Sequence, residues 1–149
     1  QEIWKELPSD IDRIFVAQGT TTTSCGILIG APETTKVHVV PVLKGFDAKQ
    51  EMKNLFQNFF LDEETTDELF KKLIVESDYH FGGYGKYTPE LLAYITEKFT
   101  QFNLKLDPIY TAKSFFAMEQ TIKNLDLKNE KIVFLHTGGL QGANGIVAF

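Results

Sequence analysis

The sequence predicts an α/β fold, a three-layer αβα arrangement around a mainly parallel sheet. Short, β-branched-rich apolar runs lie at residues 13–17, 37–42 and 131–135, and their nearly continuous apolar character is typical of strands covered on both faces. Between these runs, apolar residues recur at helical spacing. The alternation predicts one continuous domain over residues 1–149.

The first predicted strand is followed at once by a glycine and four hydroxyl residues, Gly19, Thr20, Thr21, Thr22 and Thr23, which open a helix. The start of a helix gathers backbone N–H groups, and the glycine and hydroxyls add close approach and further donors, so this turn suits a phosphate. An ordinary strand-to-helix turn is the alternative, because Ser and Thr are common in turns and N-caps.

Three apolar stripes predict helices whose buried faces belong to the core. Thr88 and Pro89 predict that one of them begins there and runs to about Phe102. Thr65 and Glu68 have capping-box spacing for a shorter helix through Leu73. The stripes are Met52, Leu55, Phe56, Phe59 and Phe60; Leu91, Leu92, Ile95, Phe99 and Phe102; and Phe115, Met118, Ile122 and Leu125.

Composition narrows the class of protein. The 149 residues are 43% hydrophobic and 13% aromatic, which is enough for a core, and the net charge of -5 comes from interspersed acids and bases without a basic cluster for nucleic acid. No apolar stretch approaches the ~20 residues of a bilayer span, so we expect a soluble, cytoplasmic protein. The single cysteine, Cys25, excludes an internal disulfide; we expect a buried side chain, with a reactive thiol as the alternative.

Three further loops lie at the ends of predicted elements, where open α/β sheets bind ligands. One has three glycines around Tyr84, another brings Tyr110 and Thr111 to the start of a helix, and the third holds Thr137 and Gly138 after the last strand. Each loop alone is also compatible with an ordinary turn.

The histidines and Lys113 carry weaker signals. We expect His38 to be a hydrogen-bonded histidine of its strand, and no metal site, because His80 and His136 lack zinc-ligand spacing. Lys113 is the lysine nearest the predicted site, and we expect it to modulate the electrostatics of that site or to face solvent.

Taken together, four motifs resemble the pyridoxal-phosphate enzymes of the 1-aminocyclopropane-1-carboxylate deaminase and D-cysteine desulfhydrase family. The motifs are residues 16–23, 83–85, 107–114 and 134–139, and the resemblance covers residues 12–149. It implies a tryptophan synthase β-like fold (fold type II), of which this chain is similar to the C-terminal half. The Schiff-base lysine of the family lies in the N-terminal half, and nothing here corresponds to it.

The resemblance implies roles for particular residues. Gly19 through Thr23 would hold the cofactor phosphate, and Tyr84 and Tyr110 would contact the substrate carboxylate and assist proton transfer. A tyrosine with an ordinary pKa near ~10 is a poor base at neutral pH, so a base role would need a neighbouring cation. Thr111, with Thr137 and Gly138 nearby, would meet the pyridine nitrogen.

Position 111 separates the two branches of the family. The deaminases that open the cyclopropane ring carry a glutamate there, whereas Thr111 is neutral, which is similar to the D-cysteine desulfhydrases. We therefore expect a small amino acid to lose its α-proton and a β-substituent such as sulfide, with release of pyruvate and ammonia. The alternative is a non-catalytic phosphate-binding or interaction module.

The resemblance also bears on assembly. If this segment normally packs against the N-terminal half of the family's fold, part of its apolar surface is uncovered without that half, and such surface favours a homodimer.

Overall fold

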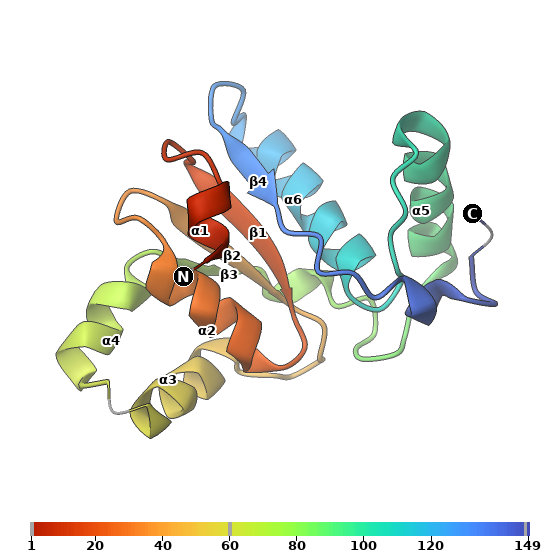
Figure 1. Ribbon diagram of the computed structural model, residues 1–149. Helices are drawn as coiled ribbons and strands as arrows, with labels where there is room; N and C mark the ends of the chain where they lie inside the picture. Colours follow the sequence, from red (N-terminus) through yellow and green to blue (C-terminus); the bar gives the residue numbers. More distant parts are fainter. Residues whose placement is uncertain (1, 60, 148) are drawn as a thin grey trace.

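The structure is a computed structural model that describes residues 2–59, 61–147 and 149, and Figure 1 shows its elements along the chain. Four parallel strands form one sheet in the order β3-β2-β1-β4. They are β1 (Arg13–Gln18), β2 (Lys36–Pro41), β3 (Leu73–Val75) and β4 (Ile132–Phe134). The predicted α/β fold with a parallel sheet is confirmed, and β3 is the strand that the sequence analysis missed.

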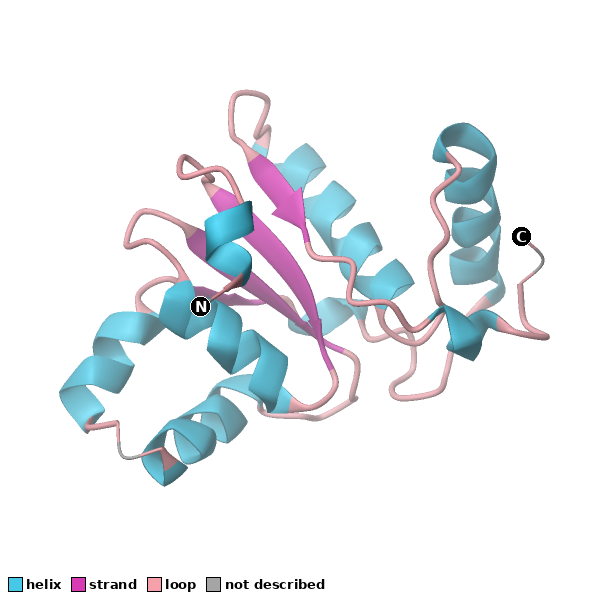
Figure 2. Cartoon of the chain, viewed as in Figure 1, coloured by secondary structure: helices cyan, strands magenta, loops and turns pink. Residues whose placement is uncertain are grey.

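Helices cover both faces of this sheet, as Figure 2 shows. On one face, Ile14 and Val16 of β1 pack with Met52 and Phe56 of α3, all fully buried, beside α2. The other face is covered by α6, against which α5 packs. The helices are α1 (Ile3–Glu6), α2 (Thr21–Gly30), α3 (Ala48–Asn58), α4 (Glu63–Phe70), α5 (Pro89–Phe102) and α6 (Thr111–Leu125), with 3₁₀ turns η1 (Ser77–Tyr79) and η2 (Leu140–Ala143).

Helix α5 begins and ends as the sequence predicts. The Thr88 hydroxyl accepts a hydrogen bond from the Leu91 N–H at 3.2 Å, and Pro89 occupies the first helical position. Asn103 then ends the helix in a left-handed conformation, with φ of 53°.

Helix α4 departs from the prediction, because its cap is Asp62 and not Thr65. The Asp62 carboxylate accepts from the Thr65 N–H at 2.7 Å, and the acidic side chain also complements the helix dipole. The helix ends at Phe70, and Leu73, which was predicted to lie in it, begins β3 beside Val37. Both the capping box and the boundary at Leu73 were therefore wrong.

The apolar stripes are buried in their middle and exposed at their ends. Phe59, Phe102 and Leu125 lie at the ends of α3, α5 and α6 and are 65%, 66% and 57% exposed, so their assignment to core faces was wrong. Phe60 lies outside the described residues. The ends of these helices extend beyond the sheet that covers their middle. Sequence periodicity identifies the apolar face of a helix but not how far along the helix that face is covered.

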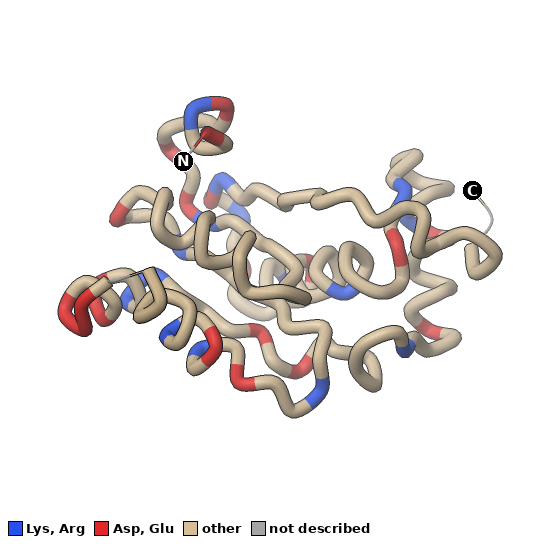
Figure 3. Tube along the Cα trace, turned by 60° about the horizontal axis from the view of Figure 1, so that its bottom comes forward, with Lys and Arg blue, Asp and Glu red and all other residues tan. Residues whose placement is uncertain are grey.

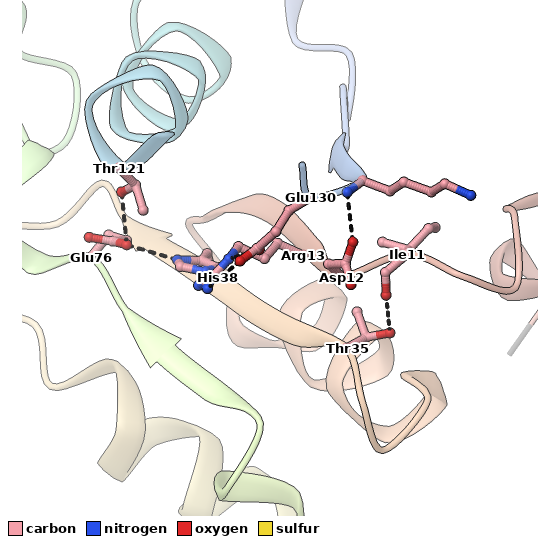
Figure 4. Close-up of polar contacts among 9 residues, drawn as sticks. Ile11, Asp12, Arg13, Thr35, His38, Glu76, Thr121 and Glu130 are labelled. Carbon is pink, nitrogen blue, oxygen red and sulfur yellow. Dashed lines mark hydrogen bonds and ion pairs between the residues drawn. The ribbon is translucent and has the colours of Figure 1, made fainter. Parts of the chain in front are cut away.

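His38 is a hydrogen-bonded core histidine, as expected, and belongs to a polar chain across the α6 face of the sheet (Figure 4). Arginine only donates, so its contact at 3.0 Å makes the His38 Nε2 the acceptor and leaves Nδ1 to donate to Glu76 at 2.8 Å. Glu130 pairs with Arg13 at one end, and the Thr121 hydroxyl donates to Glu76 at the other.

Acidic and basic residues are both distributed along the chain, which Figure 3 shows as separate red and blue segments of the trace. In the part of the chain that the structure describes, no helix has both the length and the apolar character needed to cross a membrane.

Candidate functional site

Loops at the carboxyl ends of β1 and β4 enclose a cavity of about 230 Å³. Parallel strands present these ends at one edge of the sheet, which is where open α/β sheets bind ligands. Figure 1 shows the turn between β1 and α2, the start of α6 and the chain after β4 converging there. The lining residues are Ala17, Gly19, Thr20, Thr23, Tyr110, Thr137, Gly138 and Gly139.

The turn before α2 brings backbone donors to this cavity. Thr20 is the N-cap and makes no side-chain capping bond, so the first N–H groups of α2 are open to a ligand. Gly19 lies against the ring of Tyr110, and a Cβ at position 19 would stand 2.5 Å from the Tyr110 Cε1. Glycine is therefore required at position 19 for the turn and the tyrosine to approach this closely.

A second cavity, of about 250 Å³, shares the Gly19 turn with the first and is lined by Gly19, Thr20, Leu43, Tyr84 and Tyr110. The two tyrosine rings meet edge to face, with centroids 6.0 Å apart and planes at 67°. A hydrogen bond with Tyr84, followed by burial, raises the pKa of Tyr110 to about 12. Tyr110 is therefore a neutral donor at physiological pH.

A buried carboxylate, Asp107, fixes the start of α6. Its Oδ1 accepts from the N–H groups of Ile109 and Tyr110 at 2.9 and 2.8 Å, and its Oδ2 accepts from the Thr111 N–H at 2.9 Å and the Thr111 hydroxyl at 2.6 Å. The Thr111 hydroxyl in turn accepts from the Asp107 N–H at 2.8 Å. Both side chains are fully buried, so the hydroxyl proton of Thr111 is held by Asp107 and Thr111 lines neither cavity.

The loop after β4 is shaped by a histidine. The His136 Nδ1 accepts from the Gly138 N–H at 3.2 Å, so the Nε2 carries the proton and donates to the Lys105 carbonyl at 2.8 Å. Gly138 and Gly139 have φ of 88° and 83°, a region that glycine adopts without strain. This turn places Thr137 at the cavity.

The structure thus brings together seven of the predicted site residues. Thr21 and Thr22 belong to the first turn of α2 without lining a cavity, and Thr111 is buried beneath the site. Their cofactor roles remain predictions, and for Thr111 a hydrogen bond to a ring nitrogen would require its hydroxyl to leave Asp107. The seven are Gly19, Thr20, Thr23, Tyr84, Tyr110, Thr137 and Gly138.

Sequence reasoning missed four residues of the site, Ala17, Leu43, Gly139 and Asp107. Two of them carried a signal: Gly139 lies in the glycine pair after the last strand, and an aspartate shortly before a predicted helix, such as Asp107, is typical of an Asx turn or cap. Ala17 and Leu43 contribute by position at strand ends, which residue type does not reveal.

Lys113 does not face solvent, so that half of its expectation was wrong. Its side chain is fully buried and its Nζ donates to the Gly83 carbonyl at 2.8 Å. Within the described ranges, no lysine lines either cavity, and no three His, Cys, Asp or Glu side chains converge as a metal site would require.

The similar proteins found by sequence and by structure carry the same description, although no protein-family model matches the chain. Two proteins named "Putative 1-aminocyclopropane-1-carboxylate deaminase" are similar: that of Pyrococcus abyssi is 34% identical over 142 residues, and that of Pyrococcus horikoshii 32% over 145. They match 93% and 95% of this chain but only 42% and 43% of their own lengths.

A solved structure described as that of the ACC deaminase homologue superposes with a TM-score of 0.73 at 30% sequence identity. It matches 95% of this chain and 44% of that one. The chain therefore spans less than half the length of the relatives it matches.

Proposed function

We propose that the chain belongs to the family of the 1-aminocyclopropane-1-carboxylate deaminase homologues and forms the cofactor-binding part of a pyridoxal-phosphate enzyme that acts on a small amino acid. The cavity in which Gly19, Thr20 and Thr23 meet Thr137 and Gly138 carries this proposal. The chain spans 42% to 44% of its relatives, and the remainder of such a protein would supply the Schiff-base lysine and the other wall of the site.

The residues around the cavity fit the phosphate of pyridoxal phosphate. The start of α2 offers N–H groups, Thr20 and Thr23 offer hydroxyls, and in the described part of the chain no Asp or Glu lines the cavity to repel an anion. At about 230 Å³ the cavity is smaller than the ~300–1,000 Å³ that encloses a drug-sized ligand. It therefore suits one end of the cofactor.

When bound, pyridoxal phosphate supplies an electron sink for the bond broken at the substrate Cα. This chain supplies hydroxyl groups beside the phosphate turn, from Tyr84 and Tyr110. Because the pKa of Tyr110 is raised to about 12, its hydroxyl holds its proton at neutral pH and can donate to a substrate carboxylate or a departing group. A cation brought next to it would be needed before it could act as a base.

Elimination of a β-substituent is the reaction we propose, in preference to ring opening. Position 111 holds a neutral threonine, and the neighbouring carboxylate of Asp107 already accepts four hydrogen bonds from residues 109–111. Neither group supports a protonated ring nitrogen. In the whole protein we expect D-cysteine to yield sulfide and pyruvate. Release of 2-oxobutanoate from 1-aminocyclopropane-1-carboxylate, without turnover of D-cysteine, would overturn this choice.

Binding to the chain itself is tested with adjacent threonines as a matched pair. Thr23 lines the cavity whereas Thr22 does not, although both are exposed in the first turn of α2. A hydrogen bond to a charged group contributes ~1.5–3 kcal/mol, so Thr23→Val should weaken pyridoxal phosphate binding by tenfold or more in calorimetry, and Thr22→Val should not. Equal affinities for the two variants would contradict the assignment of the cavity.

Borohydride reduction addresses the missing anchor. After incubation with pyridoxal phosphate and reduction, we expect no stoichiometric adduct at any one lysine in peptide mass spectra. A single modified lysine would show that the chain has its own anchor. Binding no tighter than that of inorganic phosphate would instead favour the non-catalytic phosphate-binding module.

A further inference from the structure

Lys113 is a fully buried lysine in the first turn of α6, three residues after Tyr110. A buried ammonium group is costly unless it is hydrogen-bonded, and the partner here is the main-chain carbonyl of Gly83, 2.8 Å from Nζ. Burial lowers the pKa of Lys113 to about 8, while Asp107 acts in the opposite direction. The Lys113 amino group lines neither cavity and has no part in the proposed chemistry.

Gly83 belongs to a loop whose backbone is unusual. Phe81, Gly82, Gly83 and Gly85 all have positive φ, between 49° and 112°. The loop closes on itself: the Gly83 N–H donates to the His80 carbonyl at 3.0 Å, and the Gly83 carbonyl also accepts from the Lys86 N–H at 3.2 Å. The bond from Lys113 joins this closed loop to helix α6.

Tyr84 follows Gly83 directly and is 58% exposed, so burial does little to fix its ring. Its ring nevertheless lies edge to face with Tyr110, whose position is set by the start of α6. Both tyrosines are thus attached to the same helix end, Tyr110 through the chain and Tyr84 through the bond between Lys113 and Gly83.

We propose that Lys113 is a positioning residue that holds the Gly83 carbonyl and thereby sets Tyr84 against Tyr110. A catalytic role for this tyrosine pair rests on the proposed function. The contact between Tyr84 and Tyr110 does not depend on it and can be tested without measuring turnover.

Lys72 provides the matched control. It is also a buried lysine, 8% exposed, and its Nζ donates to a main-chain carbonyl, that of Ala31 at 2.6 Å. It lies just before β3, at the opposite edge of the sheet from the tyrosines. Lys113→Met and Lys72→Met each remove one buried amino group and its bond to a carbonyl, but only the first frees the loop of Tyr84.

The test is the ionisation of Tyr110 in the isolated chain, followed at pH 10 by NMR of ¹³C-labelled tyrosine and assigned with Tyr110→Phe. A pKa of about 12 leaves about one Tyr110 in a hundred ionised in the wild type. In Lys113→Met the loss of the contact with Tyr84 should lower the pKa of Tyr110 and raise the ionised fraction at pH 10 above that of the wild type, although burial and Asp107 still oppose ionisation. Lys72→Met should titrate as the wild type does.

An unchanged Tyr110 titration in folded Lys113→Met, or the same change in both variants, would overturn the proposal. If Lys113→Met does not fold, Lys113→Leu replaces it, because it also lacks a donor for the Gly83 carbonyl, and the same two outcomes decide. In the whole protein, Lys113→Met should lower kcat, and adding it to Tyr84→Phe should cost little more. Absence of turnover in the wild type would count against the proposed function, whereas the NMR result decides the role of Lys113.

Discussion

Replacing Gly19 by alanine is the sharpest perturbation of the candidate site. The new Cβ would lie 2.5 Å from the Tyr110 Cε1 and 3.3 Å from both Cζ and the hydroxyl oxygen. Ordinary carbon contacts are ~3.5–4.0 Å, so the ring or the turn must move by about 1 Å. Overpacking of this kind costs ~1–3 kcal/mol, and here the movement falls on both cavities at once.

Two glycines within α2 itself, Gly26 and Gly30, separate the local effect from general destabilisation. A Cβ at Gly26 meets nothing within 4 Å, so Gly26→Ala should stabilise the helix by ~0.5–1 kcal/mol. A Cβ at Gly30 would overlap the Trp4 indole of α1, so Gly30→Ala should cost stability away from the site.

Urea unfolding and calorimetric titration with pyridoxal phosphate provide the comparison. Gly19→Ala should lose both stability and at least tenfold in affinity, since ~1.4 kcal/mol of lost binding free energy corresponds to that factor. Gly30→Ala should lose stability alone. Unchanged affinity in Gly19→Ala, or an equal loss in Gly30→Ala, would refute the assignment of Gly19 to the phosphate turn.

Four further results are expected. Gln18→Met should raise the free energy of unfolding by ~1 kcal/mol, because the buried Gln18 amide has no hydrogen-bond partner among the described residues; a decrease would indicate that an ordered water satisfies it. Cys25 should resist a thiol reagent at pH 8 until the chain unfolds, since burial raises its pKa to about 12; rapid labelling of the folded chain would contradict this. Between about pH 8 and pH 10.5 the wild type should gain stability relative to Lys113→Met in urea unfolding, because the unfolded chain keeps the Lys113 proton that the folded chain releases; an unchanged difference across that range would contradict this. Light scattering at high concentration should detect a dimer through exposed aromatic residues such as Phe59 and Phe102, and a strict monomer would oppose that expectation.

The sequence was most informative where one residue type has one main use. Thr88 followed by Pro89 located the start of α5, and continuous apolar runs located three of the four strands. The strand β3 escaped because three residues, Leu73–Val75, carry too short a pattern to distinguish from the end of the preceding helix. Its place in the sheet is decided by pairing with β2, which local preference does not encode.

The site was predicted by its glycines and hydroxyls, whereas its supporting contacts were not. Nothing in the residue type of Lys113 indicates that its ammonium turns inward to the Gly83 carbonyl, because lysine is usually exposed. Similarly, Thr111 was assigned by motif to the cofactor, but the choice of Asp107 as its partner depends on the turn that precedes α6. Contacts between side chains and distant main-chain atoms follow from the fold rather than from spacing.

The polar chain of Figure 4 has a consequence for strand alignment. Its members follow the spatial order of the sheet: Glu130 precedes β4, Arg13 lies in β1, His38 in β2, and Glu76 follows β3. A slip of one residue in any strand would turn its member to the opposite, apolar face and leave the buried His38 and its partly buried charged neighbours without partners. Misaligned pairings are therefore penalised across the whole width of the sheet, and the two short outer strands are aligned by charge as well as by their few backbone bonds.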